Sequence, residues 1–149
     1  MKKKTKKFAD RITNGSLVER SKYLRKLADS AFNNKHYLES SIIYFQTVEF
    51  SLRLVIHLLS IRKGLSKWAM DEIEKERYFP PLVLYLDLLK PGNIFSQRLL
   101  RFNNSRNNFI HKLYFAESVE SLETGLKNFC IEGKDLIHHL LQDIGLQED

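Results

Sequence analysis

The sequence predicts an all-α protein, an up-and-down bundle of about five to six helices. Apolar residues recur at three- and four-residue steps through most of the chain, which is the period of an α-helix. No stretch alternates apolar and polar residues between turn residues, as a half-buried strand would. Glycine and proline fall between the periodic segments, at positions such as Gly64, Pro91 and Gly92.

The second predicted helix, about residues 37–63, follows a first helix that runs from Ser16 to about residue 34. Because apolar side chains surround most of its circumference, we expect it to be the central, largely buried helix. Glu49 and Arg53 belong to its one polar row, are spaced for an ion pair, and are candidates to line a cleft. A solvated stripe with an ordinary ion pair is the simpler interpretation. The row consists of Gln46, Glu49, Arg53, His57 and Ser60.

Four more helical segments follow, at about residues 68–77, 80–90, 94–114 and 118–144. Two prolines open the second of these segments, and a proline–glycine pair ends it. We expect Trp68 to anchor the first segment by packing rather than to stack on a nucleic-acid base. No repeat recurs at a fixed period, so the sequence predicts one bundle rather than an array.

The length and composition fit a single domain over residues 16–149. Of the 149 residues, 43% are hydrophobic and 28% are charged, which is ordinary for a globular protein. Residues 1–15 offer too little apolar surface to offset the entropy of ordering, so we expect a flexible basic arm. Five of the 24 basic residues are lysines of this arm, and the other 19 nearly balance the 18 acidic residues. RNA contact and a solubilising role are both open for the arm.

Several classes of protein find no support in the sequence. The single cysteine, Cys130, has apolar neighbours and is predicted to be an inert core thiol, without a disulfide or a metal. His138 and His139 would point about 100° apart on a helix, so we expect an exposed pair rather than metal ligands. No uninterrupted apolar run approaches the roughly 18 residues that span a bilayer. We therefore expect a cytoplasmic protein with no metal, no cofactor and no membrane contact.

An arginine, Arg106, interrupts the apolar stripe of the fifth helical segment. Apolar residues on either side predict that this position faces packing, and an unpaired buried charge is costly. The guanidinium must therefore meet an anion, a carbonyl or water. Pairing with Glu49 of the central helix is one possibility. The stripe reads Leu99, Phe102, Arg106, Phe109 and Leu113.

The surroundings of Arg106 are basic and polar. No acidic residue occurs between Asp87 and Glu117, where several lysines and arginines lie, whereas the segment that follows is acidic. A row beside Arg106 offers amide, imidazole and phenol groups at helical spacing, and it could equally be a solvated face. The basic residues are Lys90, Arg98, Arg101, Arg106 and Lys112, and the polar row is Asn104, Asn107, His111 and Tyr114.

The pattern Arg106-Asn107-x-x-x-His111, in a late helix of such a bundle, resembles the HEPN superfamily (higher eukaryotes and prokaryotes nucleotide-binding). That superfamily consists of all-α bundles with Arg, a polar residue that is often Asn, and then His. Arg and His at this spacing are common by chance, and the Asn directly after the Arg makes the match more specific. One subfamily carries Tyr two residues after the His, where this chain has Leu113 and then Tyr114.

The resemblance implies a metal-independent endoribonuclease of the toxin or antiviral-defence kind, with its site between two protomers of a homodimer and an antitoxin or defence-system partner. In this interpretation Arg106, Asn107 and His111 are catalytic. His111 can act as acid or base near neutrality, and Arg106 can hold two phosphate oxygens. The candidate RNA-binding residues around them are Arg98, Arg101, Asn104, Lys112 and Tyr114.

On a straight helix, Arg106 and His111 would point about 140° apart, so two protomers or a local helix break would have to bring them together. Two other interpretations stay open. One is a HEPN-like module that binds RNA, a nucleotide or a protein partner without cutting. The other is a bundle that serves only as a structural dimerisation element.

Overall fold

The structure is a computed structural model that describes residues 16–115 and 118–145, and within these ranges all regular secondary structure is α-helical, with no strand. This confirms the predicted all-α bundle. The observed helices lie close to the predicted ranges, because proline, glycine and capping residues mark their ends. They are α2 (Ser16–Asn33), α3 (Tyr37–Arg62), α4 (Lys67–Glu74), α5 (Phe79–Leu89), α6 (Ser96–Phe115) and α7 (Val119–Asp143).

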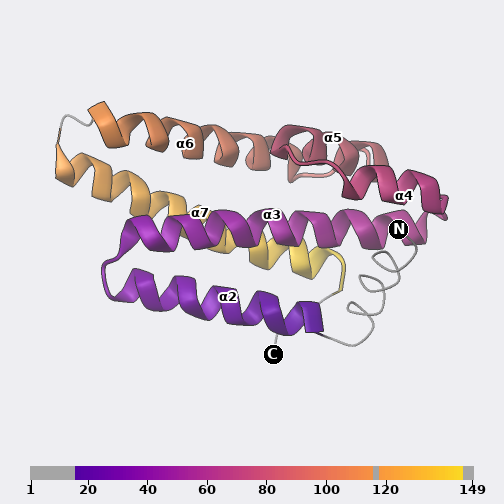
Figure 1. The fold of residues 1–149 in the computed structure, drawn as a ribbon, viewed down its shortest axis with the longest axis horizontal. Helices are drawn as coiled ribbons and strands as arrows, with labels where there is room; N and C mark the ends of the chain where they lie inside the picture. Colours follow the sequence, from indigo (N-terminus) through magenta and orange to yellow (C-terminus); the bar gives the residue numbers. More distant parts are fainter. Residues whose placement is uncertain (1–15, 116–117, 146–149) are drawn as a thin grey trace.

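The long helices α2, α3, α6 and α7 run along the length of the molecule, with α2 antiparallel to α3 and α6 antiparallel to α7, while α3 and α7 run in the same direction (Figure 1). The turn between α2 and α3 lies at the same end as the end of α6 and the start of α7. The short helices α4 and α5 lie at the opposite end. The predicted basic arm, residues 1–15, lies outside the described residues.

Helix α3 is the centre of the bundle, as its composition predicted. Val48 and Leu52 are completely buried, and the apolar cluster around them draws on α2, α5, α6 and α7. Several buried hydroxyl groups on α3 donate to the helix's own carbonyls, and Ser40 Oγ donates to the carbonyl of Ala28 on α2 at 2.8 Å, so these donors are satisfied within the core. Ser51 Oγ donates to the carbonyl of Thr47 at 2.8 Å, and Ser60 Oγ donates to that of Ile56 at 2.7 Å.

Among the described residues, α3 is also the one helix long and apolar enough to cross a membrane by length and composition. More than half of its most apolar window, 56%, is buried inside the bundle. The central helix of a bundle meets the same criteria, because its apolar side chains face neighbouring helices on most sides. The structure therefore gives no clear membrane span.

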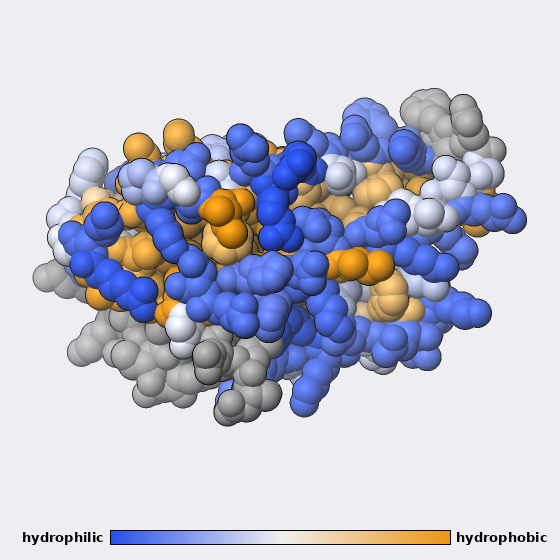
Figure 2. Space-filling model, turned by 180° about the vertical axis from the view of Figure 1, so that it is seen from behind, coloured by the Kyte–Doolittle hydropathy of each residue, from blue (hydrophilic) through white to orange (hydrophobic). Residues whose placement is uncertain are grey.

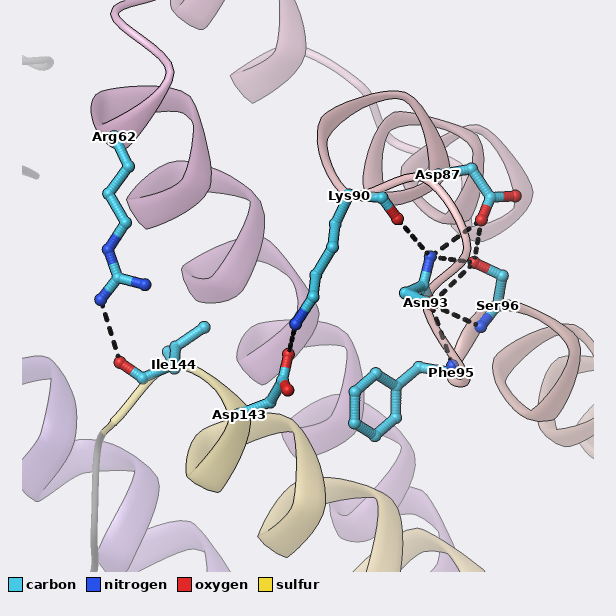
Figure 3. A network of polar contacts seen from close by, with 8 residues as sticks. All are labelled: Arg62, Asp87, Lys90, Asn93, Phe95, Ser96, Asp143 and Ile144. Carbon is cyan, nitrogen blue, oxygen red and sulfur yellow. Dashed lines mark hydrogen bonds and ion pairs between the residues drawn. The ribbon is translucent and has the colours of Figure 1, made fainter.

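A polar network fixes the corner between α5 and α6 (Figure 3). Asn93 Oδ1 accepts hydrogen bonds from the backbone N–H groups of Phe95 at 2.9 Å and Ser96 at 3.0 Å. Its amide donates to Asp87 Oδ1 at 2.9 Å. Because Asn93 satisfies amides at the beginning of α6, it sets the start of the helix that carries the Arg–Asn–His pattern. Lys90 ties the same corner to Asp143 at the end of α7.

Two predictions about individual side chains are wrong. Trp68 does not anchor α4, since it is 74% exposed. It lies five residues before Ile73, which faces the bundle, and five helical residues turn about 140°. His57 is not part of a solvated stripe, since it is only 8% exposed. Its end of α3 is covered by α4 and α5, whereas Glu49 and Arg53 further along the row are half-buried.

The prediction of a core thiol is confirmed, since Cys130 is 1% exposed. Burial raises the pKa of this thiol, so the group stays protonated at neutral pH and is a poor nucleophile. The predicted exposed histidine pair is correct for His138 only. His139 is half-buried beside Arg98, with 3.4 Å between His139 Nδ1 and Arg98 Nη1.

Candidate functional site

The three residues of the Arg–Asn–His pattern lie in the middle of α6, and all three are exposed. Helix α6 is a continuous α-helix from Ser96 to Phe115, so no break alters its geometry. Arg106 and His111 therefore point about 140° apart within one chain. The sequence left two ways to bring them together, a helix break and a second protomer. The continuous helix excludes the first, so only a second protomer could do it.

Arg106 rests on an aromatic ring. Its guanidinium carbon lies 4.1 Å from the centroid of the Phe45 ring, a cation–π contact between α6 and α3. The possible pairing of Arg106 with Glu49 is not present, because Glu49 Oε1 binds Arg53 Nη2 at 3.3 Å. Within the described part of the chain, no carboxylate forms an ion pair with Arg106. Its N–H donors are thus oriented by stacking and are not neutralised by an internal acid.

The expectation that Arg106 faces packing is only partly correct. The stripe begins in the core, with Leu99 at 0% and Phe102 at 2% exposure, but Leu113 is 44% exposed. Helix α6 therefore leaves the core between Phe102 and Leu113. Arg106 stands at that transition, with one face on Phe45 and the other toward solvent.

A groove with a volume of about 260 Å³ opens at this transition, between α3, α6 and α7. Arg106 is the charged residue that lines the groove and Gln46 contributes an amide, while most other lining groups are apolar. Four large apolar side chains along it are 44–52% exposed, which is unusual for a solvated surface. These four are Leu38, Ile42, Ile110 and Leu113.

Stacked aromatic rings form the floor of this groove. The rings of Phe102 and Phe129 are parallel with centroids 4.2 Å apart, and Phe45 stacks on Phe102 at 5.8 Å. A glycine lets α6 and α7 approach here, because a Cβ at Gly125 would lie 2.6 Å from Phe109 Cε1. The platform under Arg106 is thus held by close helix packing rather than by polar contacts.

The predicted RNA-binding residues of α6 fall into different environments. Arg101, Asn104 and Lys112 are exposed. Arg98 is already paired, since its Nε and Nη2 atoms lie 3.2 Å and 3.1 Å from Glu132 Oε1. The side chain of Tyr114 lies outside the described part of the structure.

Arg98 and Arg101 border a second, open groove of about 590 Å³ between α6 and α7. Seen from behind, the molecule is covered mainly by hydrophilic residues (Figure 2). The basic segment pairs with the acidic segment that follows it at two places, Arg98 with Glu132 and Lys90 with Asp143, while Arg101 forms no ion pair with a described carboxylate.

Glu49 and Arg53, the proposed cleft-lining residues, do not meet Arg106. Their predicted ion pair is present, and each side chain is 29% exposed. Arg53 lines a different cavity, of about 190 Å³, between α3, α4 and α5. Sequence reasoning missed this cavity, although a histidine placed among large apolar residues on the most buried helix was a signal for it. It is lined by Arg53, Ile56, His57, Ser60, Met70, Ile73, Glu74 and Leu82.

The described residues hold no cluster of three or more His, Cys, Asp or Glu side chains arranged to bind a metal ion. The chemistry available near Arg106 is that of a guanidinium, amides and an imidazole. Such groups can bind an anion and transfer protons. No protein-family model, curated protein or solved structure matches the chain.

Proposed function

We propose that this protein is a metal-independent endoribonuclease of HEPN type that acts as a homodimer. Arg106, Asn107 and His111 are its catalytic residues. The proposal carries with it a cytoplasmic location and a role as a toxin or antiviral-defence component with a cognate partner protein. The observation that supports it best is the state of Arg106, which is stacked on Phe45, open to solvent and without a carboxylate partner among the described residues.

A guanidinium held in this way is suited to a phosphate. The ring of Phe45 fixes its plane, and its N–H groups can bind two phosphate oxygens in a bidentate fashion. The net charge of the chain is +6, which favours encounter with a polyanion. Arg101 and Lys112 are exposed on the same helix, about 140° and 120° around it from Arg106, so they would contact RNA from another face of α6.

The reaction follows from these groups. The ribose 2′-oxygen attacks the adjacent phosphorus and loses its proton to a base, while the bond from phosphorus to the 5′-oxygen breaks and that oxygen gains a proton. His111 serves as the proton donor or acceptor, and Asn107 orients the histidine or the ribose. Arg106 stabilises the negative charge that develops on the phosphorane oxygens. The products are a 2′,3′-cyclic phosphate and a 5′-hydroxyl, and no metal is required.

The dimer is part of the same proposal. Arg106 and His111 point apart on one α6 helix, so a complete site needs the His111 of one protomer near the Arg106 of the other. The exposed apolar side chains along the Arg106 groove, such as Ile42 and Leu113, supply a surface that a second protomer can bury. A twofold interface would place two equivalent sites side by side.

The test is incubation of the purified protein with labelled RNA in the presence of EDTA. We expect fragments that end in cyclic phosphate, and His111→Ala should abolish them without altering the helical circular dichroism spectrum. Asn108→Ala, at an exposed neighbouring position outside the pattern, is the matched control and should cut normally. RNA that stays intact across varied substrates would exclude the nuclease.

The alternative function is a HEPN-like module that binds RNA, a nucleotide or a protein partner through the same groove without cutting. The angular separation of Arg106 and His111 within one chain favours this alternative. The same experiment distinguishes the two functions. A binder would shift labelled RNA in a gel and lose that shift with Arg106→Ala, but would leave the RNA intact.

A further inference from the structure

We propose that the cavity between α3, α4 and α5 binds a small primary ammonium compound with an apolar body, with the carboxylate of Glu74 as its partner. This site lies at the end of the bundle where α4 and α5 cover α3 (Figure 1). His57 follows Phe45 by twelve residues on α3, so the cavity is about 18 Å along the helix from the ring under Arg106. The proposal does not depend on the ribonuclease function.

The size and walls of the cavity define the body of the ligand. Its volume is about 190 Å³. A dry apolar cavity of about 150 Å³ is large enough for benzene, so this one accommodates a single ring with a short chain. Ile56 and Leu82 are each 1% exposed and form rigid walls. Met70 adds an adaptable, polarisable surface that suits an aromatic ring.

The charges at the mouth define the head group. Glu74 lines both the cavity and the outer rim, and its side chain is 33% exposed. Asp71 lies one turn earlier on α4, and its Oδ1 atom is buried without a hydrogen-bond partner in the described structure. Two carboxylates one helical turn apart repel each other, and a cation bound to Glu74 would reduce that repulsion.

Two of the protein cations near Glu74, Arg53 and Lys75, pair with other carboxylates. Arg53 Nη2 lies 3.3 Å from Glu49 Oε1, and Lys75 Nζ lies 2.8 Å from Glu72 Oε1. His57 Nδ1 is 3.8 Å from Glu74 Oε1, which is too far for a direct hydrogen bond. Within the described structure, Glu74 therefore has no fully charged partner. Arg77 lines the outer rim but forms no ion pair with a described carboxylate.

The titration behaviour of the mouth agrees with this geometry. Burial, together with the charge of Asp71, raises the pKa of Glu74, and burial lowers the pKa of His57. Both directions are those expected where burial disfavours charge. A mostly apolar pocket with a few convergent polar groups and perturbed pKa values is the usual form of a small-molecule site.

Entry to the cavity is through α4. This eight-residue helix has no buried side chain, so less apolar surface holds it in place than holds any long helix. A short element of this kind opens at small free-energy cost and can close over a ligand. Its N-terminus is fixed by Ser66, whose side chain accepts a hydrogen bond from Ala69 N at 3.2 Å.

The test uses three probes of the same shape and different charge: 2-phenylethylamine, 2-phenylethanol and phenylacetate. Binding to the full-length protein is followed by isothermal titration calorimetry and by amide chemical-shift changes in α4 and α5. We expect the amine to bind at least tenfold more tightly than the alcohol, and phenylacetate to bind least. Equal affinity for the amine and the alcohol, or no binding of the amine, would overturn the proposal.

Variants of α4 residues test whether Glu74 binds the ammonium group of the ligand. Glu74→Gln should weaken the amine about tenfold and leave the alcohol unchanged, because it removes the charge and keeps the shape. Glu72→Gln is the matched control, since Glu72 lies on the same helix, pairs with Lys75 and does not line the cavity. Ile73→Phe should fill the cavity and abolish binding of both probes. Unchanged amine affinity in Glu74→Gln would overturn the assignment, and His111→Ala should bind the amine normally whether or not the protein cuts RNA.

Discussion

Two hollows lie near opposite ends of α3, and the charged residue that marks each one has the opposite sign. At the α2–α3 end, the groove is open and apolar, and a single cation, Arg106, stands on an aromatic floor. At the α4–α5 end, the cavity is smaller and its mouth carries Glu74 without a fully charged partner in the described structure. Under the two proposals, the α2–α3 end of the bundle binds an anion and is called the anion end, and the α4–α5 end binds a cation and is called the cation end. The difference comes from one charged residue in each hollow, Arg106 or Glu74. Neither residue has a fully charged partner in the described structure.

The largest expected effect is on RNA cleavage at the anion end. Arg106→Ala should lower the cleavage rate about 10²–10³-fold, since it removes the one cation placed to stabilise the phosphorane. Arg106→Lys should recover little, because a lysine lacks the bidentate, ring-stacked geometry. The rates are measured with labelled RNA under single-turnover conditions. A loss of less than threefold in Arg106→Ala would remove Arg106 from the chemistry.

The next effect concerns dimerisation. Ile42→Asp places a charge on the rim of the Arg106 groove, where the side chain is 52% exposed, and should raise the dimer dissociation constant about 100-fold or more. Leu88→Asp, at a 68% exposed position on α5 near the other end, is the control and should leave the dimer intact. Analytical ultracentrifugation measures both. A wild-type monomer at tens of micromolar, or equal effects of the two variants, would contradict the proposed interface.

A smaller effect, on stability, is expected at the contact between α6 and α7 beside the Arg106 groove. Gly125→Ala should destabilise the fold by about 1–3 kcal/mol, because its Cβ would lie 2.6 Å from Phe109 Cε1. Chemical denaturation measures the change in the free energy of unfolding. In a Gly125→Ala/Phe109→Leu double variant, the smaller leucine side chain leaves room for the new Cβ. The loss of stability should therefore be less than the sum of the losses in the two single variants. Strict additivity would mean that this contact does not limit the approach of α6 and α7.

The smallest expected effect is on how stability depends on pH, through His57 at the α4–α5 end. Burial lowers the pKa of His57 from its ordinary value of 6.5, so the unfolded chain binds this proton more tightly than the folded one. Stability should therefore fall as the pH drops below about 6.5. Glu74 of α4 and Arg53 of α3 line the same cavity, and the raised pKa of Glu74 acts in the opposite direction at lower pH.

His57→Asn should therefore lose less stability than the wild type between pH 7 and pH 5.5. His138→Asn is the control for replacing a histidine that is not buried, because His138 is exposed and lies outside both proposed sites. Thermal melts at a series of pH values measure both. Identical curves for the wild type and His57→Asn would show that burial of this imidazole does not affect folding.

The sequence predicted the fold class correctly and singled out Arg106, but it did not predict the cavity at the cation end. Helical periodicity and glycine–proline boundaries predicted the helices, because those signals are local. The interruption of an apolar stripe drew attention to Arg106 for the same reason. The open groove around it depends on where α6 leaves the core, which is a tertiary property. The cavity beside His57 forms only when α4 and α5 fold back over α3, so the local sequence marked a histidine on an apolar helix but could not place the cavity.

The burial of single side chains was harder to predict than the class of each helix. Trp68 is large and aromatic, yet its helix is too short to cover it. His57 belongs to a polar row, yet its neighbours in space are apolar. Both errors arise because propensity describes a residue, while burial depends on what packs against it.

The most direct test of the central claim mixes two inactive variants, Arg106→Ala and His111→Ala, after dissociation and reassociation of the dimers. If each site takes Arg106 from one protomer and His111 from the other, half of the dimers will be mixed and each will hold one intact site. RNA cleavage should then return to about a quarter of the wild-type rate. Cleavage that stays at the level of the separate variants, although mixed dimers have formed, would contradict a site shared between protomers.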